Sequence, residues 1–523
     1  MRLVRGICLC ALVLACGTAG AASVTVTNTN DSGSGSLRDA IAQANADTGS
    51  ASTISITATG TIALLSGLAT STPLAITGPG ASQLTIAGAT GGPVFTTSAS
   101  ALTVSGVTIT GGGSEMLDAG SVFEATGPLA LVDVVLTSST SSEGAVITGF
   151  GGVTLTRTTI TGCSALIGVI YLRASAAIVD STIASNSGTA IVTVGDGAVV
   201  TITGSTIANN TASGGVGGIQ VQGGSVLASN STFSGNQGAE GGDLWTYSSG
   251  VTIQLDAVTL SGGMPNALFL QNPGTVTAHD TILTSAGTAC TGAITSLGHN
   301  LAGDTSCGLG SGSGDLQGVD PMLGALGSNG GPTQTMRPMA GSPAINAGED
   351  DAGSGSGSAT DQRGRPRVVF SAQDIGAVEY GAPTIVGPTT PVSVNVGATL
   401  ELQVTATDPE NGTLTYQWLK DGQLLTGAAA PGYIKTNVDA SDAGSYTVAV
   451  TNGGGTVTSS AAVVTVGYPA DDFGVSPDAG TSSSGNGGGC CSAQGDARGA
   501  IGSVALGLGV IALAVGKRRR RRR

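Results

Sequence analysis

The chain has 523 residues, of which 40% are hydrophobic, 10% are charged and 87 are glycine, and its formal net charge is −14. A disordered chain would be rich in charge and poor in aliphatic residues, so this composition favours ordered β-structure with many tight turns. Ten of the 19 lysines and arginines lie at the two ends of the chain. The acidic middle therefore lacks the basic patches that neutralise phosphates, and we expect no nucleic-acid partner.

Residues 1–21 are predicted to form a secretory signal peptide. Two arginines precede the apolar run "ICLCALVLAC", and the small residues of "GTAGAAS" follow it. We expect cleavage after Ala21 or Ala22. A lipoprotein signal that is cut before Cys16 is the alternative, although Leu14 stands where such signals prefer a smaller residue.

The use of cysteine agrees with export. Three of the eight cysteines lie in the predicted signal peptide and two lie near the C-terminus, which leaves Cys163, Cys290 and Cys307. Cys290 and Cys307 are near enough in sequence to close a short disulfide loop in an oxidising compartment. Cys163 is then expected to be a small buried hydrophobe.

The segment "SLRDAIAQANA", residues 36–46, predicts a short helix. Ser36 can cap its N-terminus, with Asp39 three residues further on. We expect the helix to cover the open end of the domain that follows, because an uncovered sheet edge promotes aggregation. Its apolar face is formed by Leu37, Ala40, Ile41 and Ala44.

An internal repeat fills the region after Ser23. Segments such as "LTVSGVTIT", "LALVDVVLT" and "VTITGSTIA" share two alternating apolar positions, one turn position and a threonine-rich step. A second short strand, such as "VIYL" or "ALFL", follows in most periods, and the turn positions are 23 to 27 residues apart. This pattern predicts one coil of a parallel β-helix per period. The turn positions are Gly106, Asp133, Arg157, Asp180, Gly204, Asn230, Ala257 and Asp280.

These repeats, together with "VTNTNDSGSGSLRDAIAQAN" near the start, resemble secreted bacterial right-handed β-helix repeat proteins. The resemblance implies a right-handed parallel β-helix over residues 22–319, which begins with the capping helix. Some parallel β-helix proteins are polysaccharide lyases or hydrolases. Such enzymes need clustered carboxylates, or a calcium-assisted site with a basic residue that abstracts a proton.

The charged residues of the turn positions need no catalytic explanation, because aspartate tolerates turn geometry. Arg157 lies between Asp133 and Asp180 in this column, and coils about 4.8 Å apart predict an exposed Asp–Arg–Asp ladder. His279, one of two histidines, lies beside Asp280 but has no second carboxylate in its segment, which disfavours a catalytic role.

If the chain is an enzyme, its better acidic pair is Glu240 and Asp243, beside Trp245. The sequence favours a protein without chemistry of its own, and we expect no cofactor. The glycine- and aspartate-rich nonapeptide repeat that binds calcium is absent, so no metal site is predicted.

The second strands of the repeat predict an aromatic outer face. If Leu172, Val221 and Leu244 point into the coil, their neighbours point outward by the alternation of side chains in a strand. Aromatic rings with amides between them suit the binding of sugar rings or peptide strands. Cover by a loop or a neighbouring domain is the alternative. The predicted ligand-binding residues are Tyr171, Gln220, Gln222, Trp245, Tyr247, Phe269 and Gln271.

Residues 320–381 contain the run "GSPAINAG", "DQRGRPR" and "DIGAVEY". This run resembles the segment called choice-of-anchor Q, which is found at the end of secreted bacterial β-helix proteins, ahead of various surface anchors. The resemblance implies a closing segment and names no activity. Asp361 and the three arginines that follow it predict an ion-paired final coil or closing cap.

Residues 382–467 change to short antiparallel strands. The stretches "YQWLKDG" and "DAGSYTVAV" resemble an immunoglobulin-like domain, with Trp418 as the core tryptophan and Tyr446 as the tyrosine corner. Val404 and Val448 stand where that fold has its paired cysteines, so the disulfide is missing while the fold is expected to remain.

The C-terminal region reads as a linker followed by a sorting signal. Residues 468–489 have linker composition. Residues 490–523 combine Cys490 and Cys491, an uncharged run at 500–516 and a basic end. The run is at the short end of the roughly 17–25 residues of a membrane helix, and the basic end is expected to stay in the cytoplasm.

This order of features resembles the C-terminal sorting signal of myxobacterial surface proteins, the type called MYXO-CTERM. The resemblance implies processing in the cysteine region and display on the cell surface. The two cysteines are adjacent, which departs from the expected pattern and leaves the cleavage point open. A plain membrane anchor is the alternative.

The sequence thus predicts an all-β protein: a right-handed parallel β-helix followed by an immunoglobulin-like β-sandwich, with a C-terminal transmembrane helix. We expect an exported, cell-surface binding or adhesion protein that recognises a polysaccharide or another surface ligand. Its other expected partners are the export and sorting machinery and the membrane. A secreted polysaccharide lyase or glycoside hydrolase and a structural surface coat protein are the alternatives.

Overall fold

The computed structural model describes residues 22–468, apart from residues 48–50, 115–118, 196, 273, 311–312, 350–358, 371 and 388–389. The predicted signal peptide, both cysteines of the predicted sorting signal and the apolar run at 500–516 lie outside the described residues. Among the residues that are described, no helix is long and apolar enough to cross a membrane.

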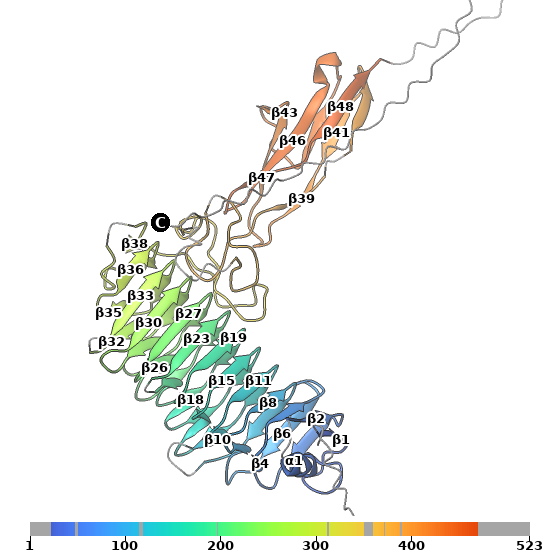
Figure 1. Ribbon diagram of the computed structural model, residues 1–523. Helices are drawn as coiled ribbons and strands as arrows, with labels where there is room; N and C mark the ends of the chain where they lie inside the picture. The colour runs from blue at the N-terminus through green and yellow to red at the C-terminus, as the bar shows by residue number, and fades with distance from the viewer. Residues whose placement is uncertain are drawn as a thin grey trace, which may run out of the picture. The chain divides into compact units, whose positions relative to one another are not determined.

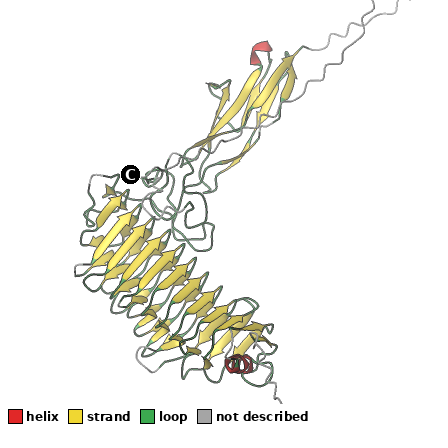
Figure 2. Cartoon of the chain, in the orientation of Figure 1, coloured by secondary structure: helices red, strands yellow, loops and turns green. Residues whose placement is uncertain are grey.

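Three long parallel sheets and a short corner sheet wind around one core and form the β-helix (Figures 1 and 2). The strands of the first sheet are β1 (Ser23–Val26), β2 (Ser52–Ile56), β5 (Leu74–Thr77), β8 (Leu102–Ser105), β11 (Leu129–Val132), β15 (Val153–Thr156), β19 (Ala176–Val179), β23 (Val199–Thr203), β27 (Ser225–Ser229), β30 (Thr252–Asp256), β33 (Thr275–His279) and β36 (Thr295–Gly298). The strands of the second sheet are β3 (Gly60–Ala63), β6 (Leu84–Gly88), β9 (Thr108–Gly111), β12 (Val135–Thr137), β16 (Thr159–Thr161), β20 (Thr182–Ala184), β24 (Thr206–Ala208), β28 (Thr232–Ser234), β31 (Thr259–Gly263), β34 (Ile282–Ser285), β37 (Leu301–Ala302) and β38 (Leu316–Gln317).

The third sheet completes the coils, and the corner sheet adds a short strand to four of them. The third sheet comprises β4 (Leu68–Thr70), β7 (Phe95–Thr97), β10 (Gly120–Ala125), β14 (Ala145–Gly149), β18 (Gly168–Leu172), β22 (Val192–Val194), β26 (Ile219–Val221), β29 (Leu244–Thr246), β32 (Asn266–Leu270) and β35 (Thr288–Thr291). The corner sheet comprises β13 (Thr140–Ser141), β17 (Ser164–Ala165), β21 (Ser187–Gly188) and β25 (Thr211–Ala212).

The aliphatic core follows from the alternation in the strands. In β23, Val200 and Ile202 are buried, whereas the residues between and beside them are exposed. Ile202 lies in register with Ile178 in the coil before it and Ala228 in the coil after it. A slip by one residue would turn this row toward solvent, so the buried pattern fixes the register. The predicted β-helix is confirmed.

The predicted turn positions lie between the first and the second sheet. All eight have a positive φ, between 44° and 64°, which is the left-handed conformation that glycine, asparagine and aspartate tolerate best. Arg157 and Ala257 adopt it too, with φ of 47° and 52°. The turn is thus imposed by the coil geometry, even where the residue type disfavours it.

The predicted capping helix is present as α1 (Leu37–Ala46). The Ser36 side chain accepts a hydrogen bond of 3.2 Å from the Asp39 backbone N–H, as a helix cap does. The four residues of the predicted apolar face are all buried, and they belong to the same core as the first coils. The helix therefore covers the N-terminal end of this core.

Residues 320–381, the closing segment, do not form a final coil, which is one of the two structures that we expected there. Their described residues contain no helix or strand, and they bind the side of the second sheet. The Thr232 hydroxyl donates to Gln362 Oε1 at 2.6 Å, and Thr259 Oγ1 accepts from the Ala377 backbone N–H at 3.0 Å. Glycine, proline and turn residues dominate this segment, so side-chain contacts hold it in place of a strand ladder.

Ion pairs are nevertheless present in the closing segment. Arg363 is fully buried and contacts Asp361 at 2.9 Å and Glu410 at 3.0 Å. Arg365 contacts the same Glu410 carboxylate at 3.1 Å. Arg367 donates to Asn230, one of the turn residues of the β-helix. A buried charge is tolerated only when it is paired in this way.

The immunoglobulin-like domain has a separate core around Trp418 and Tyr446. The indole Nε1 donates to the Ala430 carbonyl at 3.0 Å, and the Tyr446 hydroxyl donates to the Asp442 carbonyl at 2.8 Å, which is the tyrosine corner. Val404 and Val448 are buried in place of the cysteines. The elements are β39 (Thr384–Val386), β40 (Val392–Asn395), β41 (Leu400–Gln403), β42 (Thr405–Thr407), β43 (Thr415–Lys420), β44 (Gln423–Leu424), β45 (Gly432–Lys435), a 3-10 turn (Ala440–Asp442), β46 (Gly444–Thr451), β47 (Thr456–Thr458) and β48 (Ala462–Gly467).

Candidate ligand-binding groove

The predicted aromatic face is only partly open to solvent. Gln220, Trp245 and Phe269 lie in register on β26, β29 and β32, as the alternation requires. The expectation that Trp245 is exposed is wrong, because only 5% of it is accessible. The edge of Tyr247 packs on its indole with ring centroids 4.9 Å apart, and the Phe269 ring lies 5.8 Å away. Gln220 is buried as well.

The other predicted residues of this face remain accessible to different degrees. Tyr247 is 44% exposed and Gln271 is exposed, whereas Tyr171, Gln222 and Phe269 are half-buried. Tyr171 lies 5.7 Å from the guanidinium of Arg173. The rings pack mostly on one another and do not form a continuous stacking platform.

Glu240 and Asp243 do not form the acidic pair that we considered for an enzyme. Glu240 is exposed, whereas Asp243 is completely buried and its Oδ1 accepts from Asn236 Nδ2 at 2.8 Å. Burial raises the pKa of Asp243 to about 8. The Asp243 carboxyl is therefore a structural group inside the coil, which removes it from any surface site.

A buried asparagine stack explains the position of Asp243. Asn186 Nδ2 donates to Asn210 Oδ1, Asn210 Nδ2 donates to Asn236 Oδ1, and Asn236 ends on Asp243. Each amide also donates to a backbone carbonyl of the coil before it. The three asparagines are 24 and 26 residues apart and each lies six residues after a turn position, so the repeat in the sequence carries a signal for this stack.

The cysteines and the predicted charge ladder can also be placed. A disulfide joins Cys290 to Cys307, and Cys163 is a buried free thiol whose pKa is raised by burial. Arg157 donates to both carboxylate oxygens of Asp133, at 2.7 and 2.8 Å. Within the described residues it forms no ion pair with Asp180, so half of the expected ladder is present.

A groove of about 570 Å³ lies on the outer side of the first sheet, from β23 to β36. Two outward rows form its floor. The rows follow the register of the strands, so that each coil contributes one residue to each row. The first row is Thr201, Leu227, Gln254 and Thr277, and the second is Thr203, Ser229, Asp256 and His279.

A β-bulge closes one end of this groove. The register between β33 and β36 shifts after Ala278, and His279 then pairs with Gly298. The extra residue is Leu297, which is 58% exposed and lines the groove. Bulges of this kind re-aim side chains next to functional sites.

The same end of the groove carries its titratable groups. His279 is 5% exposed, and its Nδ1 lies 2.9 Å from Asp256 Oδ1. This hydrogen bond raises the pKa of His279. Asp280 is buried beside it, and burial raises the pKa of Asp280 to about 6. The carboxylate partner of His279, Asp256, comes from the preceding coil, so the segment around His279 does not show the pair.

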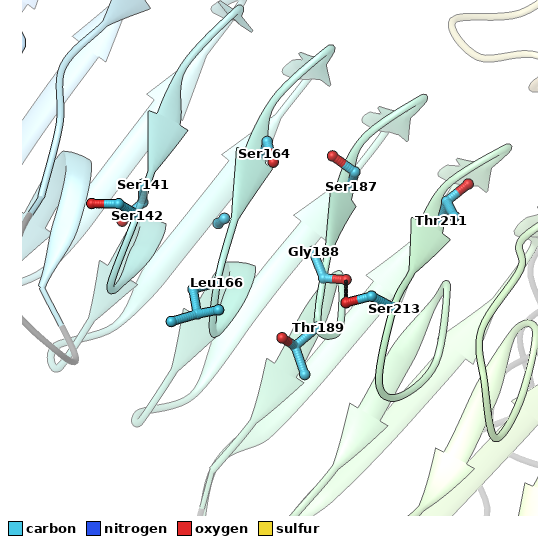
Figure 3. Close-up of a pocket in the computed structure, with 10 residues that line it drawn as sticks. Ser141, Ser142, Ser164, Leu166, Ser187, Gly188, Thr189, Thr211 and Ser213 are labelled. Atoms are coloured by element: carbon cyan, nitrogen blue, oxygen red, sulfur yellow. Dashed lines mark hydrogen bonds between the residues drawn. The ribbon is translucent and has the colours of Figure 1, made fainter.

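A second hollow, of about 410 Å³, lies on the corner sheet (Figure 3). Ser164, Ser187 and Thr211 form one of its rows on successive coils, and Leu166 is its exposed apolar residue. The lining residues are small and uncharged. This hollow offers hydroxyl groups and no titratable group.

Two family models match the chain. One is described as a right handed beta helix region and matches residues 92–258 and 143–300, and the other is the immunoglobulin I-set domain and matches residues 383–466. A curated relative, a decoration protein of Escherichia phage T5, is 47% identical over 64 residues, which is 12% of this chain. The chain covers 38% of that relative's length.

Solved structures that are similar to the chain contain immunoglobulin domains. A complex of titin M10 with an obscurin-like 1 Ig domain is 29% identical, with 17% of this chain and 96% of that chain covered and a TM-score of 0.15. The four N-terminal Ig domains of Dscam1 isoform 1.9 are 25% identical, with 16% and 20% covered and a TM-score of 0.14. The chain thus combines a right-handed β-helix with an immunoglobulin-like domain, an architecture consistent with an extracellular surface or binding protein.

Proposed function

We propose that this protein is displayed on the cell surface and binds an extended polysaccharide along the groove of the first sheet. The proposal rests on the two in-register rows of outward residues from β23 to β33. Each coil adds one residue to each row, and all of these residues are polar except Leu227 in the first row. Coils repeat about every 4.8 Å, so the groove presents the same kind of contact at regular steps to a polymer of repeating units.

The chemistry of the rows suits a sugar polymer. Thr201, Ser229 and Gln254 supply hydroxyl and amide groups that both donate and accept hydrogen bonds, as sugar hydroxyls require. The exposed Leu227 and Leu297 offer apolar contact to the carbon faces of the sugar rings. Binding sites typically combine apolar surface with a few polar groups of this kind.

The proposed location rests on the sequence and on the disulfide. The predicted signal peptide, the Cys290–Cys307 disulfide and the predicted C-terminal sorting signal agree with export and display. The closing segment resembles choice-of-anchor Q segments, which precede surface anchors.

A binding experiment tests the proposal. The full-length protein is purified in mild detergent, and its binding to a panel of neutral and acidic polysaccharides is measured. The double variant Ser229→Ala/Gln254→Ala is expected to bind its polysaccharide at least about tenfold more weakly, which corresponds to about 1.4 kcal/mol. Thr154→Ala, an exposed position on β15 outside the groove, is the matched control and is expected to change binding by less than about twofold.

Three outcomes would contradict the proposal. Equal binding by the groove variant and the control would exclude the groove, and loss of binding in Tyr247→Ala alone would move the site to the third sheet. Release of shortened products would show an enzyme in place of a binding protein.

A further inference from the structure

The two histidines of the chain converge on one carboxylate. His279 ends β33, and His299 follows Gly298, which is the residue paired with His279 on β36. The Nε2 atoms of His279 and His299 lie 4.0 and 3.6 Å from Glu349 Oε2, which comes from the closing segment. Three potential metal-binding side chains from two neighbouring coils and the closing segment therefore meet at one point.

Both imidazole rings are held by their other nitrogen. His279 Nδ1 lies 2.9 Å from Asp256 Oδ1, and His299 Nδ1 lies 2.8 Å from the Ala347 carbonyl. Metal-binding histidines characteristically donate Nδ1–H to a carboxylate or a carbonyl in this way, which fixes the tautomer and leaves the Nε2 lone pair for the metal.

An unsatisfied buried atom marks the same point. His279 Nε2 is inaccessible to solvent and has no hydrogen-bond partner, although it faces Glu349. Buried polar side-chain atoms almost always have a partner, so an orphan of this kind indicates a missing water or ion. Three carboxylates, Asp256, Asp280 and Glu349, surround the His279 ring and favour a cation.

The distances from the two histidine Nε2 atoms to Glu349 Oε2, 4.0 and 3.6 Å, are slightly longer than the ligand–ligand distances of a zinc site. Tetrahedral zinc binds histidine nitrogen and carboxylate oxygen at about 2.0–2.2 Å, which places the ligand atoms roughly 3.3–3.5 Å apart. No group of three His, Cys, Asp or Glu in the described ranges is already arranged to hold an ion. Glu349 is half-exposed, and a movement of its carboxylate by roughly half an ångström would bring its oxygen to the distances of a zinc ligand.

We propose that His279 Nε2, His299 Nε2 and the Glu349 carboxylate bind one zinc ion, with water in the fourth position. Two nitrogen ligands favour zinc over calcium or magnesium, which take oxygen ligands. The ion ties the closing segment to the last coils of the β-helix, beside the bulge at Leu297. This site goes beyond the proposed polysaccharide binding and does not depend on it.

Zinc content decides the proposal. Untagged full-length protein in a Cys490→Ser/Cys491→Ser background is stripped with a chelator, equilibrated with zinc chloride and analysed for bound metal. We expect the Glu349→Gln and His299→Gln variants each to bind one equivalent of zinc fewer than the parent, or to bind that zinc ion at least a hundredfold more weakly. Glu240→Gln, which removes an exposed carboxylate elsewhere, is expected to keep the parent value.

Thermal unfolding supplies an independent readout. Zinc is expected to raise the unfolding temperature of the parent and of Glu240→Gln, and to leave that of the two site variants unchanged. Magnesium is expected to have no effect. Equal zinc content in the parent and in both site variants would overturn the proposal. Loss in His299→Gln with full retention in Glu349→Gln would place the ion elsewhere and would also overturn it.

Discussion

Asp243 shows how a single residue can look catalytic in the sequence and be structural in the fold. Its carboxyl group is completely buried, and only Oδ1 has a hydrogen-bond partner, the amide of Asn236. Removing an ionised carboxylate from water is so costly that the group keeps its proton instead. At neutral pH the folded protein therefore carries a neutral acid at this position.

This neutral acid predicts a pH dependence of stability. The pKa of Asp243 is about 8 in the folded protein against an ordinary value of 3.8, so between these values only the unfolded chain is ionised. The contribution of Asp243 to stability is thus expected to fall as pH rises from about 4 to about 8, and to stay constant above that.

The variant Asp243→Asn keeps the acceptor for Asn236 and removes the titration. We expect it to be more stable than the parent by about 4 kcal/mol at pH 7 and equal to it near pH 4. Urea unfolding at a series of pH values measures this difference. Glu240→Gln is the neighbouring exposed control. An unchanged slope in Asp243→Asn would show that the carboxyl group is ionised in the folded protein.

At the scale of an element, the asparagine stack binds successive corners of the β-helix together. The side-chain amide nitrogens of Asn186 and Asn210 each donate a hydrogen bond to the side-chain oxygen of the next asparagine in the stack. The stack starts below Cys163, whose backbone N–H donates to Asn186 Oδ1. Such chains of buried hydrogen bonds stabilise a fold only when every member is satisfied.

Removing the middle of the stack should therefore cost more than an ordinary hydrogen bond. Asn210→Ala removes the acceptor of the Asn186 backbone N–H and side-chain amide and the donor to the Ile183 carbonyl, and we expect a loss of about 2–3 kcal/mol in the free energy of unfolding. Chemical denaturation measures it, with the exposed Thr211→Ala as control at less than about 0.5 kcal/mol. A loss no larger than that of the control would mean that water replaces the amide.

The sequence predicted those elements whose signal is local or repeats at the coil period. The capping helix and the turn positions are of this kind, because Ser36 and the Asp and Gly residues of the turns act on their own backbone. The burial of Trp245 could not be predicted, because its cover comes from Tyr247 and from Phe269 one coil later. The alternation rule fixes the side on which a residue lies and does not fix what packs on it.

The candidate sites depended even more on contacts between distant segments. His279 gains Asp256 from the coil before it, and Glu349 from a closing segment that lacks regular elements. Asp256 and His279 are 23 residues apart, which is the coil period, so an alignment of the repeats predicts that these two residues are neighbours. Glu349 lies outside the repeated coils, so the period of the repeat does not predict that it lies beside His279.

At the scale of the whole molecule, the described residues form separate cores in the β-helix and in the immunoglobulin-like domain, and a smaller cluster joins the last coils to the closing segment. Trp418 lies in the core of the immunoglobulin-like domain, whereas Trp245 is buried on the outer side of the third sheet of the β-helix. In a solenoid each coil contacts only its neighbours, so its cooperativity need not extend to a domain with its own core.

We therefore expect two unfolding transitions with different midpoints. In Trp245→Phe the remaining fluorescence reports the immunoglobulin-like domain, and in Trp418→Phe it reports the β-helix. Guanidinium titrations followed by fluorescence and by circular dichroism measure both. Coincident midpoints in the parent and in both variants would show that the buried contacts of Glu410 with the closing segment couple the two cores.

The outward rows of the first sheet have a consequence for how such a protein changes over generations. Each position in the first row touches solvent and its neighbours in the row, while the fold is held by the buried residues on either side of it. A substitution at Gln254 or Thr277 can therefore alter what the groove binds without disturbing the core. Ligand preference is free to drift one coil at a time on a scaffold that stays the same.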